Sequence, residues 1–448
     1  MERSRCVRIF GVPFSELDTT AISRSLCRVA DRQDDLADAY FERREEIEVP
    51  PPDESSGIRV WREEGFALRL IREGKTWLAS RDQIEPAEFS DSMRQIARVT
   101  PVAPYTSPSL QIGPPSGLEV SEELQQFPLR VTEAIRRRLA GFPLKLTTRR
   151  HQRWVRVVGT RVAPEQERER FYSYEAETPW ARHGSLLAEL DESAVEAVAE
   201  SLTALFRTRE APPVAAGQWP VVLGAGTCAV VLHEAVAHAL ETDTLVLGGR
   251  VEAALGVQVG SELLDVLDNP AGGPEGVRRH TDDEGMMVVR RWLLRGGVVD
   301  QVLADLSTAH HSTELVAGAG RRGDRHSVPV PRSTHLELLP GEHTLPELLS
   351  DLRSGLFFPE ASRGALDPLS GVFTLRVPGG RKIEDGKLAG LIAPCSLRGQ
   401  VSDLLGAVTG IGSESLVAGA GWCAKGGVRL PVWATTPPLR LETVEVVT

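Results

Sequence analysis

Apolar residues at helical spacing mark the clearest single element of the chain. In "DESAVEAVAESLTALFRTR", Val195, Val198 and Leu202 fall on one face of a helix. The Pro-rich stretch that follows, at residues 211–218, ends this helix. We therefore predict a domain boundary there.

The part before this boundary alternates between helical and strand-like patterns. Runs rich in β-branched, aromatic and alternating residues predict antiparallel strands, and segments with apolar residues three or four apart predict flanking helices. A connection rich in Pro, Ser and Gly interrupts them at residues 100–117. We expect residues 1–212 to form an α/β domain with an antiparallel sheet. Its predicted helices lie near residues 20–32, 86–99 and 122–139, and its predicted strands near residues 35–49, 57–61, 66–72, 76–80, 144–158 and 171–177.

The part after the boundary has mostly strand character. It opens with "WPVVLGAGTCAVVLHEAVAHALETD", which predicts a buried strand, a glycine turn and one helix. We expect residues 213–448 to form a β-rich domain, so that the whole chain has an α+β fold of two domains. The further predicted elements are hairpins around Gly296-Gly297 and Asp385-Gly386 and short helices near residues 345–352 and 400–408.

The predicted helix of the second domain carries two histidines at an unusual spacing. His233 and His238 are five residues apart, and at about 100° per residue a regular helix would leave their rings roughly 140° apart. Such a pair can be structural, with each ring bonded to a carbonyl. A wider π-type turn would instead bring both rings onto one face, and such turns recur at functional sites. We predict that the helix is distorted between the two histidines.

A glutamate beside the first histidine favours a zinc site. Glu234 is flanked by Leu232, Ala235 and Val236, and a carboxylate there is costly to bury without a partner or a metal. Zinc-dependent hydrolysis needs three protein ligands, an open position for water and a nearby carboxylate. The two histidines and this glutamate would supply two of the ligands and the base.

The third zinc ligand must come from elsewhere in the chain. Cys423 has the strongest chemical argument, because a flexible glycine-rich segment carries it and Lys425 would favour its ionised form. A small buried cysteine in a loop is the alternative interpretation. Other candidate ligands are Glu241, His310, His311 and His326.

Composition limits the classes of partner and the location. The 448 residues include 51 basic and 62 acidic side chains, and a net charge of −11 disfavours binding to nucleic acid or to anionic lipid. The five cysteines are scattered and odd in number, which favours a reducing compartment. No apolar run approaches the ~20 residues that cross a bilayer. We expect a soluble, cytoplasmic protein without a membrane partner.

The histidine segment resembles a known family signature. "HEAVAHALETD" is similar to the His-Glu-x-x-x-His-x-x-Glu-x-Asp motif of the TldD/PmbA family of cytoplasmic metallopeptidases, and it matches the metal-bearing TldD type. The resemblance covers nearly the whole chain. Other stretches that carry it, in the family's order, are "ADAYFERREEIEV", "GFALRLIREGKTWLASRDQI", "DDEG", "VPVPR", "LDPLSGVFTL", "KIEDGKLAG" and "GWCAKGG".

The resemblance implies a role for each matching residue. Two departures from the family pattern affect the segment around the cysteine, where "CAK" replaces Cys-Gly-Lys and "GG" replaces Gly-Gln. The implied zinc ligands are His233, His238 and Cys423, the implied base that activates a zinc-bound water is Glu234, and Glu241 and Asp243 would orient a histidine or the end of the helix.

The family resemblance also implies a zinc peptidase that cleaves unfolded peptides inside a dimeric chamber. The partner would be a PmbA-type subunit in a heterodimer, or a second copy in a homodimer. His326 and Arg332 are candidates for substrate binding, although an exposed basic loop explains them equally well. The alternative function is a non-catalytic binding or regulatory protein with a structural metal site.

Overall fold

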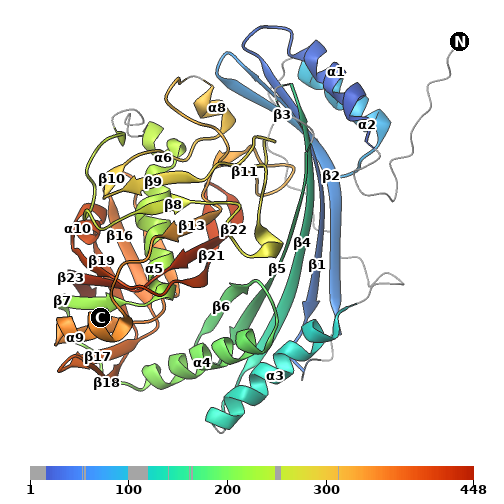
Figure 1. Cartoon of the computed structure of the whole chain (residues 1–448). Helices are drawn as coiled ribbons and strands as arrows, with labels where there is room; N and C mark the ends of the chain where they lie inside the picture. Colours follow the sequence, from blue (N-terminus) through green and yellow to red (C-terminus); the bar gives the residue numbers. More distant parts are fainter. Residues whose placement is uncertain are drawn as a thin grey trace, which may run out of the picture.

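The computed structural model describes residues 17–448, except positions 53, 55, 56, 99–119, 140, 161, 163, 164, 248–253 and 311. A long curved sheet lies along one side of the molecule, and a body built from strands and short helices packs against its concave face (Figure 1). The predicted connection at residues 100–117 and Cys6 lie outside the described residues. Within the described ranges, no helix is both long and apolar enough to span a membrane.

The curved sheet consists of six antiparallel strands in the order β3-β2-β1-β4-β5-β6. Its centre is β1, which pairs with β2 on one side and with β4 on the other. Residues 36–187 contain the whole sheet. The strands are β1 (Leu36–Val49), β2 (Arg59–Arg72), β3 (Lys75–Arg81), β4 (Lys145–Gly159), β5 (Glu165–Glu177) and β6 (Arg182–Leu187).

One strand prediction in this sheet was wrong in its extent. The stretches at 57–61 and 66–72 are parts of the single strand β2, because ion pairs hold the polar residues between them in register with β1. Glu64 accepts from Arg43 at 2.7 Å, and Arg62 donates to Glu45 at the same distance. Charged residues therefore continue a strand where the sequence pattern indicated an interruption.

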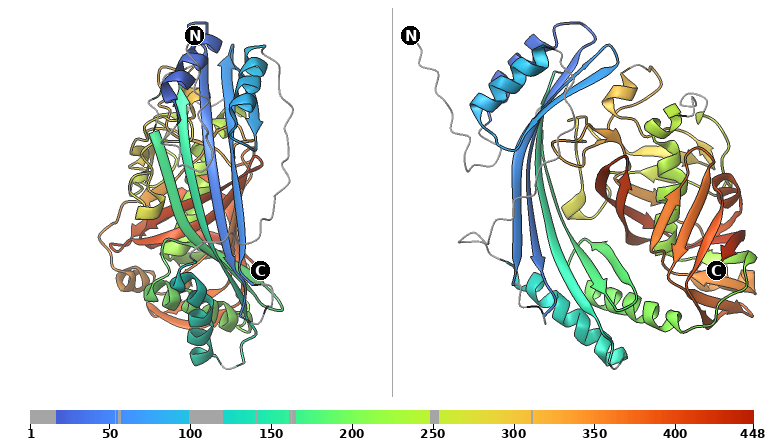
Figure 2. Two further views of the ribbon diagram at one scale, coloured as in Figure 1. Left: turned by 90° about the vertical axis from the view of Figure 1, so that its right-hand side faces the viewer. Right: turned by 180° about the vertical axis from the view of Figure 1, so that it is seen from behind.

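Four helices cover the two ends of this sheet, as predicted. Two pack at one end over a core that includes Phe41 and Phe66, and two pack at the other end over a core that includes Phe127 and Leu202 (Figure 2). The helices at the first end are α1 (Thr19–Val29) and α2 (Pro86–Ala97), and those at the second are α3 (Glu122–Arg138) and α4 (Glu192–Arg209).

The C-terminal body is built around two larger sheets. The nine-stranded sheet has the order β15-β16-β19-β23-β7-β14-β17-β18, with β20 beside β23, and all its pairs are antiparallel except β7 with β14. Its strands are β7 (Gly217–Leu223), β14 (Gly355–Phe358), β15 (Arg363–Leu366), β16 (Val372–Val377), β17 (Gly380–Glu384), β18 (Lys387–Ile392), β19 (Cys395–Gln400), β20 (Val408–Ile411) and β23 (Leu439–Val447).

The six-stranded sheet has the order β10-β9-β8-β13-β22-β21. Its strands are β8 (Val266–Asp268), β9 (Arg291–Arg295), β10 (Val298–Val299), β13 (His335–Leu338), β21 (Leu416–Lys425) and β22 (Val428–Thr436), and a further pair consists of β11 (Gly320–Arg321) and β12 (Val330–Pro331). The histidine helix, which begins with α5 (Ala225–Val231), contacts strands of both sheets. It is therefore enclosed between them. The remaining helical elements are α6 (Thr242–Leu247), η4 (Glu275–Val277), α8 (Leu306–Ala309), α9 (Leu345–Leu352) and α10 (Val401–Gly406).

The predicted α+β fold class and both predicted hairpins are confirmed. β9 and β10 are joined at Gly296-Gly297, and β17 and β18 at Asp385-Gly386, where all four residues have positive φ as a two-residue hairpin turn requires. The sheets of the two halves use separate stretches of chain. We retain residues 1–212 and 213–448 as the proposed domains.

Buried charges join the curved sheet to the C-terminal body. Arg69 on β2 donates to Asp38 on β1 and to Glu284 of the body, each at 2.6 Å. Arg322 of the body donates to the second oxygen of Asp38 at 2.8 Å. These four side chains are at most 5% exposed. Ionised groups without water around them are stable only when they are paired, so the pairs fix how the two parts dock.

Asp283 is a carboxylate of this junction that pairs with three arginines. It accepts from Arg279 at 2.6 Å and lies 3.1 Å from the Nη2 of Arg153 on β4. The same two arginines hold Glu169 on β5. Burial alone would raise the pKa of Asp283, but the surrounding guanidinium groups hold it far below its usual range. The aspartate is thus ionised and counterbalances several buried cations.

Neutralising Asp283 should therefore destabilise the protein strongly. Asp283→Asn keeps the shape of the side chain and leaves Arg279 and Arg153 short of a counter-charge, so we expect the free energy of unfolding to fall by about 3–5 kcal/mol. Urea unfolding followed by circular dichroism measures it. Asp91→Asn, at an exposed ion pair with Arg94, is the matched control and should change little. Equal losses in both variants would contradict the role assigned to the junction.

Candidate metal centre

The histidine helix changes its geometry where the two histidines lie. After α5 the chain forms the π-helical turn η2 (Leu232–Ala237) and then the 3₁₀ turn η3 (His238–Leu240). The backbone N–H of His238 donates to the carbonyl of His233, which is the bond between residues five apart that defines a π turn. The ring centroids are 4.3 Å apart. The predicted distortion is confirmed, and it places both rings on one side of the helix.

Cys423 meets the two histidines. Its Sγ lies 3.4 Å from the Nε2 of His238, although the two residues are 185 positions apart in the chain. The prediction that a flexible segment carries this cysteine was wrong, because residues 416–425 form β21, paired along its length with β22. The two strands meet at a turn at Gly426-Gly427, where positive φ is easy for glycine.

The cysteine strand is also held from the other side by the curved sheet. Trp422, next to Cys423, packs against His151 of β4 and Phe171 of β5, with ring centroids 5.2 and 5.6 Å apart. Phe171 also contacts Trp433 of β22. Aromatic packing of this kind adds stability beyond the buried area. The N-terminal half therefore supports the position of the thiol.

The three side chains fit a metal ion of the zinc type. Their ligand atoms all lie within 4.8 Å of one another, and all three residues are buried. The 3.4 Å between sulfur and nitrogen is close to the ~3.5 Å that two such ligands of one tetrahedral zinc have. Among the described residues, the buried Nδ1 of His233 has no hydrogen-bond partner. Two imidazoles and a thiolate suit zinc better than they suit magnesium or calcium.

Glu241 fixes the orientation of His238. Its carboxylate lies 2.9 Å from the Nδ1 of His238, which leaves the Nε2 directed at Cys423. Burial alone would raise the pKa of Glu241, but His238, Arg332 and Lys425 hold it below its usual value. A carboxylate that holds the second nitrogen of a metal-binding histidine selects its tautomer and raises its basicity. The predicted orienting contact of Glu241 is present.

Arg332 and Lys425 hold the carboxylates behind His238. Arg332 donates to Glu241 at 3.2 Å and to Asp243 at 2.7 Å, and its side chain is only 2% exposed. Lys425 contacts Glu241, Asp243 and Thr244. The interpretation of Arg332 as part of an exposed basic loop was therefore wrong. The structure places it behind a histidine, between the buried Glu241 and the partly exposed Asp243.

The other candidate residues lie away from the cluster. His326 contacts Ser80 and Asp82 at the curved sheet, each at 2.9 Å. The ring of His310 lies 3.0 Å from the carbonyl of Asp34. His311 is outside the described residues. Across the described ranges, the only group of potential metal ligands is the one formed by His233, His238 and Cys423.

Burial and charge act differently on the two histidines. Burial, together with the charge of the neighbouring His238, lowers the pKa of His233 to about 3. Burial would also lower the pKa of His238, but Glu241 and Cys423 raise it to about 10. Without a metal, His238 is thus the histidine that carries a second ring proton and a positive charge, whereas His233 is neutral. A metal must displace this proton to bind.

Glu234 lies beside β15, the edge strand of the nine-stranded sheet. Burial raises the pKa of Glu234, and the positive charge of His238 lowers this pKa by a smaller amount. Gly364 of β15 packs so closely that a Cβ at this position would overlap the Cγ of Glu234. This contact could not be predicted from the sequence, because a glycine in a strand indicates only that some close approach is allowed.

Comparison with known proteins places this site in a family. A model of the PmbA/TldA metallopeptidase C-terminal domain matches residues 216–448, which include all three clustered residues. The chain belongs to the TldD/PmbA metallopeptidase family. The recognition made from the sequence is thereby confirmed.

Individual members of the TldD/PmbA family match about half of the chain. A metalloprotease of Methanothermobacter thermautotrophicus is 30% identical over 243 residues, which cover 54% of this chain and 52% of that protein. The metalloprotease TldD homolog of Haemophilus influenzae is 30% identical over 259 residues, 56% of this chain and 52% of that protein. The chain thus spans about half the length of the curated relatives it matches.

A solved structure extends the likeness in fold to nearly the whole chain. TldE from Thermococcus kodakarensis superposes with a TM-score of 0.73 and covers 96% of this chain and 100% of its own, at 17% sequence identity. At this identity the match establishes the fold alone. The curved sheet and the C-terminal body are therefore a shared architecture.

Removing the carboxylate behind His238 should weaken metal binding. In Glu241→Gln the neutral amide no longer holds the imidazole as a strong acceptor, so we expect the affinity for zinc to fall about 10–100-fold. Competition with a chromophoric chelator measures it. Glu262→Gln, at an exposed position, is the control and should keep the original affinity. An unchanged affinity in Glu241→Gln would show that the contact between Glu241 and His238 does not affect zinc binding.

A methyl group on Gly364 should displace Glu234 without touching the clustered histidines and cysteine. We expect Gly364→Ala to retain its metal and to lose about tenfold or more of the peptide hydrolysis that is proposed below, because small misplacements of a catalytic group are costly. Gly390→Ala is the matched control in the same sheet, since a Cβ there meets nothing within 4 Å. Zinc content and initial rates are measured on both variants. Full activity of Gly364→Ala would exclude a catalytic position for Glu234 at this contact.

Proposed function

We propose that the protein is a zinc-dependent peptidase of the TldD type. The observation that carries the proposal is the grouping of two imidazoles and one thiol within 4.8 Å, with a carboxylate at the position next to the first histidine. A purely structural zinc site is usually closed by four protein ligands. Three ligands together with Glu234 favour a site that leaves one position for water.

Glu234 would act as the general base and then as the general acid. A zinc ion held by His233, His238 and Cys423 would supply a water of lowered pKa, near ~7, and would polarise the peptide carbonyl. Glu234 would accept the proton of the attacking water and pass it to the leaving amine. Because burial raises its pKa, this carboxylate is a stronger base toward the water than an exposed one, and it retains the proton until the amine leaves.

The substrate would be an unfolded peptide that lies along β15. Within the described sheet β15 pairs only with β16, so its other edge has no neighbouring strand, and we propose that the peptide adds there. Main-chain hydrogen bonds at such an edge bind extended peptides with little dependence on sequence. Gly364 lies on this strand and against Glu234, so a peptide added there would pass close to the base.

The proposal includes a dimer that encloses the site. The partner is a PmbA-type subunit or a second copy of this chain, in keeping with the shared TldE fold. A reducing, cytoplasmic location agrees with the four described cysteines, which are all free thiols. Neither nucleic acid nor a membrane is part of the proposed function.

Replacing the base tests the proposed reaction. We expect Glu234→Gln to retain zinc and to lose peptide hydrolysis by about 10²–10⁴-fold, because the amide cannot accept the proton of water. Zinc is measured by elemental analysis, and cleavage of an unstructured peptide by mass spectrometry. Both assays are run with the chain alone and with a PmbA-type subunit added, so that a requirement for the partner is not read as inactivity.

Two outcomes would reject the peptidase and favour the alternative of a non-catalytic protein with a structural metal. One is equal cleavage by the original protein and Glu234→Gln, which would trace the activity to a contaminant. The other is zinc-loaded protein that cleaves nothing in either assembly. Cys423→Ser serves as the second variant, since it should lose metal and activity together.

A further inference from the structure

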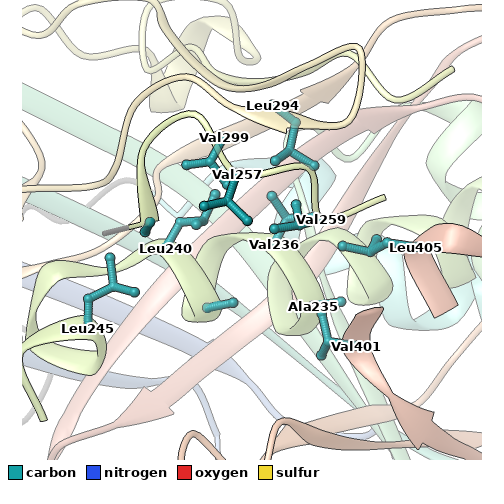
Figure 3. A pocket seen from close by; sticks show the side chains of 12 residues that line it. Ala235, Val236, Leu240, Leu245, Val257, Val259, Leu294, Val299, Val401 and Leu405 are labelled. Atoms are coloured by element: carbon teal, nitrogen blue, oxygen red, sulfur yellow. The ribbon is translucent and has the colours of Figure 1, made fainter. Parts of the chain in front are cut away.

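An apolar cavity lies on the reverse face of the histidine helix. Its volume is about 260 Å³, and each lining side chain among the described residues is an alanine, valine or leucine (Figure 3). Ala235, Val236, Ala239 and Leu240 come from the irregular turns of the helix. The other walls come from β9, β10, α6, α10 and residues 254–259. The proposed peptidase function makes no use of this space.

The chemistry of the lining restricts the occupant. A buried water needs two to four polar partners, and aliphatic walls provide none, so hydrocarbon rather than water suits the cavity. A charged group would lose its hydration without compensation. The volume exceeds the ~150 Å³ of an aliphatic cavity known to admit benzene and is below the ~300 Å³ where sites for larger ligands begin. A neutral group of one or two rings, or a branched aliphatic chain, matches these limits.

The position of the cavity couples it to the turn that holds His238. Ala239 and Leu240 follow His238 directly, while Ala235 and Val236 lie between the two histidines. Side chains that border a void lack contact partners on that side, and π and 3₁₀ turns have poorer hydrogen-bond geometry than a regular helix. An occupant would add contacts to the part of the helix that has the weakest internal bonding.

We propose that this cavity binds a small neutral hydrocarbon group and that the bound group braces the irregular turns between residues 232 and 240. Val257 provides the route of entry, because it lines the cavity and is also 44% exposed. Cavity and clustered histidines lie on opposite faces of one helix. The proposal does not depend on the peptidase function.

Toluene and phenol form a matched pair of probes for the full-length protein. Each molecule is one aromatic ring with one small substituent, but inside the cavity the hydroxyl of phenol would remain without a hydrogen bond. At tenfold excess over its dissociation constant, we expect toluene to raise the Tm by about 1–2 °C. It should also slow amide exchange at residues 234–240 about tenfold, because binding opposes local opening. Phenol should do neither.

Cavity-filling variants decide whether the effect arises at this site. Val401→Phe places a ring inside the cavity and should abolish both toluene effects, whereas Val447→Phe, at an exposed position on β23, should keep them. Should Val401→Phe fail to fold, Val257→Phe at the exposed rim serves the same purpose. The proposal is overturned by absence of both effects in the original protein, by an equal effect of phenol, or by an undiminished effect in the filled variant.

Discussion

The wide turn between His233 and His238 is the constraint on which the site depends. A regular helix cannot present residues five apart to one ligand, and the hydrogen bond from His238 to His233 removes this obstacle. Enclosure of the helix between two sheets makes the irregular backbone tolerable, because packing on both sides supports it. The chemistry at one face and the cavity at the other both follow from this departure from regularity.

Buried carboxylates are held in place by cationic side chains at two places in the molecule. At the junction, Asp283 and its arginines determine how the curved sheet docks on the body. Behind the metal centre, Arg332 and Lys425 keep the carboxylate of Glu241 ionised so that it can hold His238. In both places a buried carboxylate is stable only because cations from distant parts of the chain surround it.

The sequence predicted local features better than long-range ones. Apolar periodicity located α4, turn residues located the hairpin at Asp385-Gly386, and the spacing of the two histidines indicated the distorted helix, because each depends on neighbouring residues. The single strand β2 was missed, since ion pairs to β1 rather than apolar alternation keep it extended. Arg332 was misjudged for a related reason. An arginine in a polar, proline-rich segment reads as exposed, and only its partners 89 and 91 residues away bury it.

The distance in sequence between the clustered residues has a consequence for synthesis of the protein. Cys423 follows His238 by 185 residues, and its strand is completed only when β22 has paired with it. A chain still on the ribosome, or one cut short before β21, has both histidines but lacks the thiol. It cannot assemble all three donors, and it lacks two of the strands that enclose the helix. Synthesis of β21 and β22 thus controls when the centre first exists.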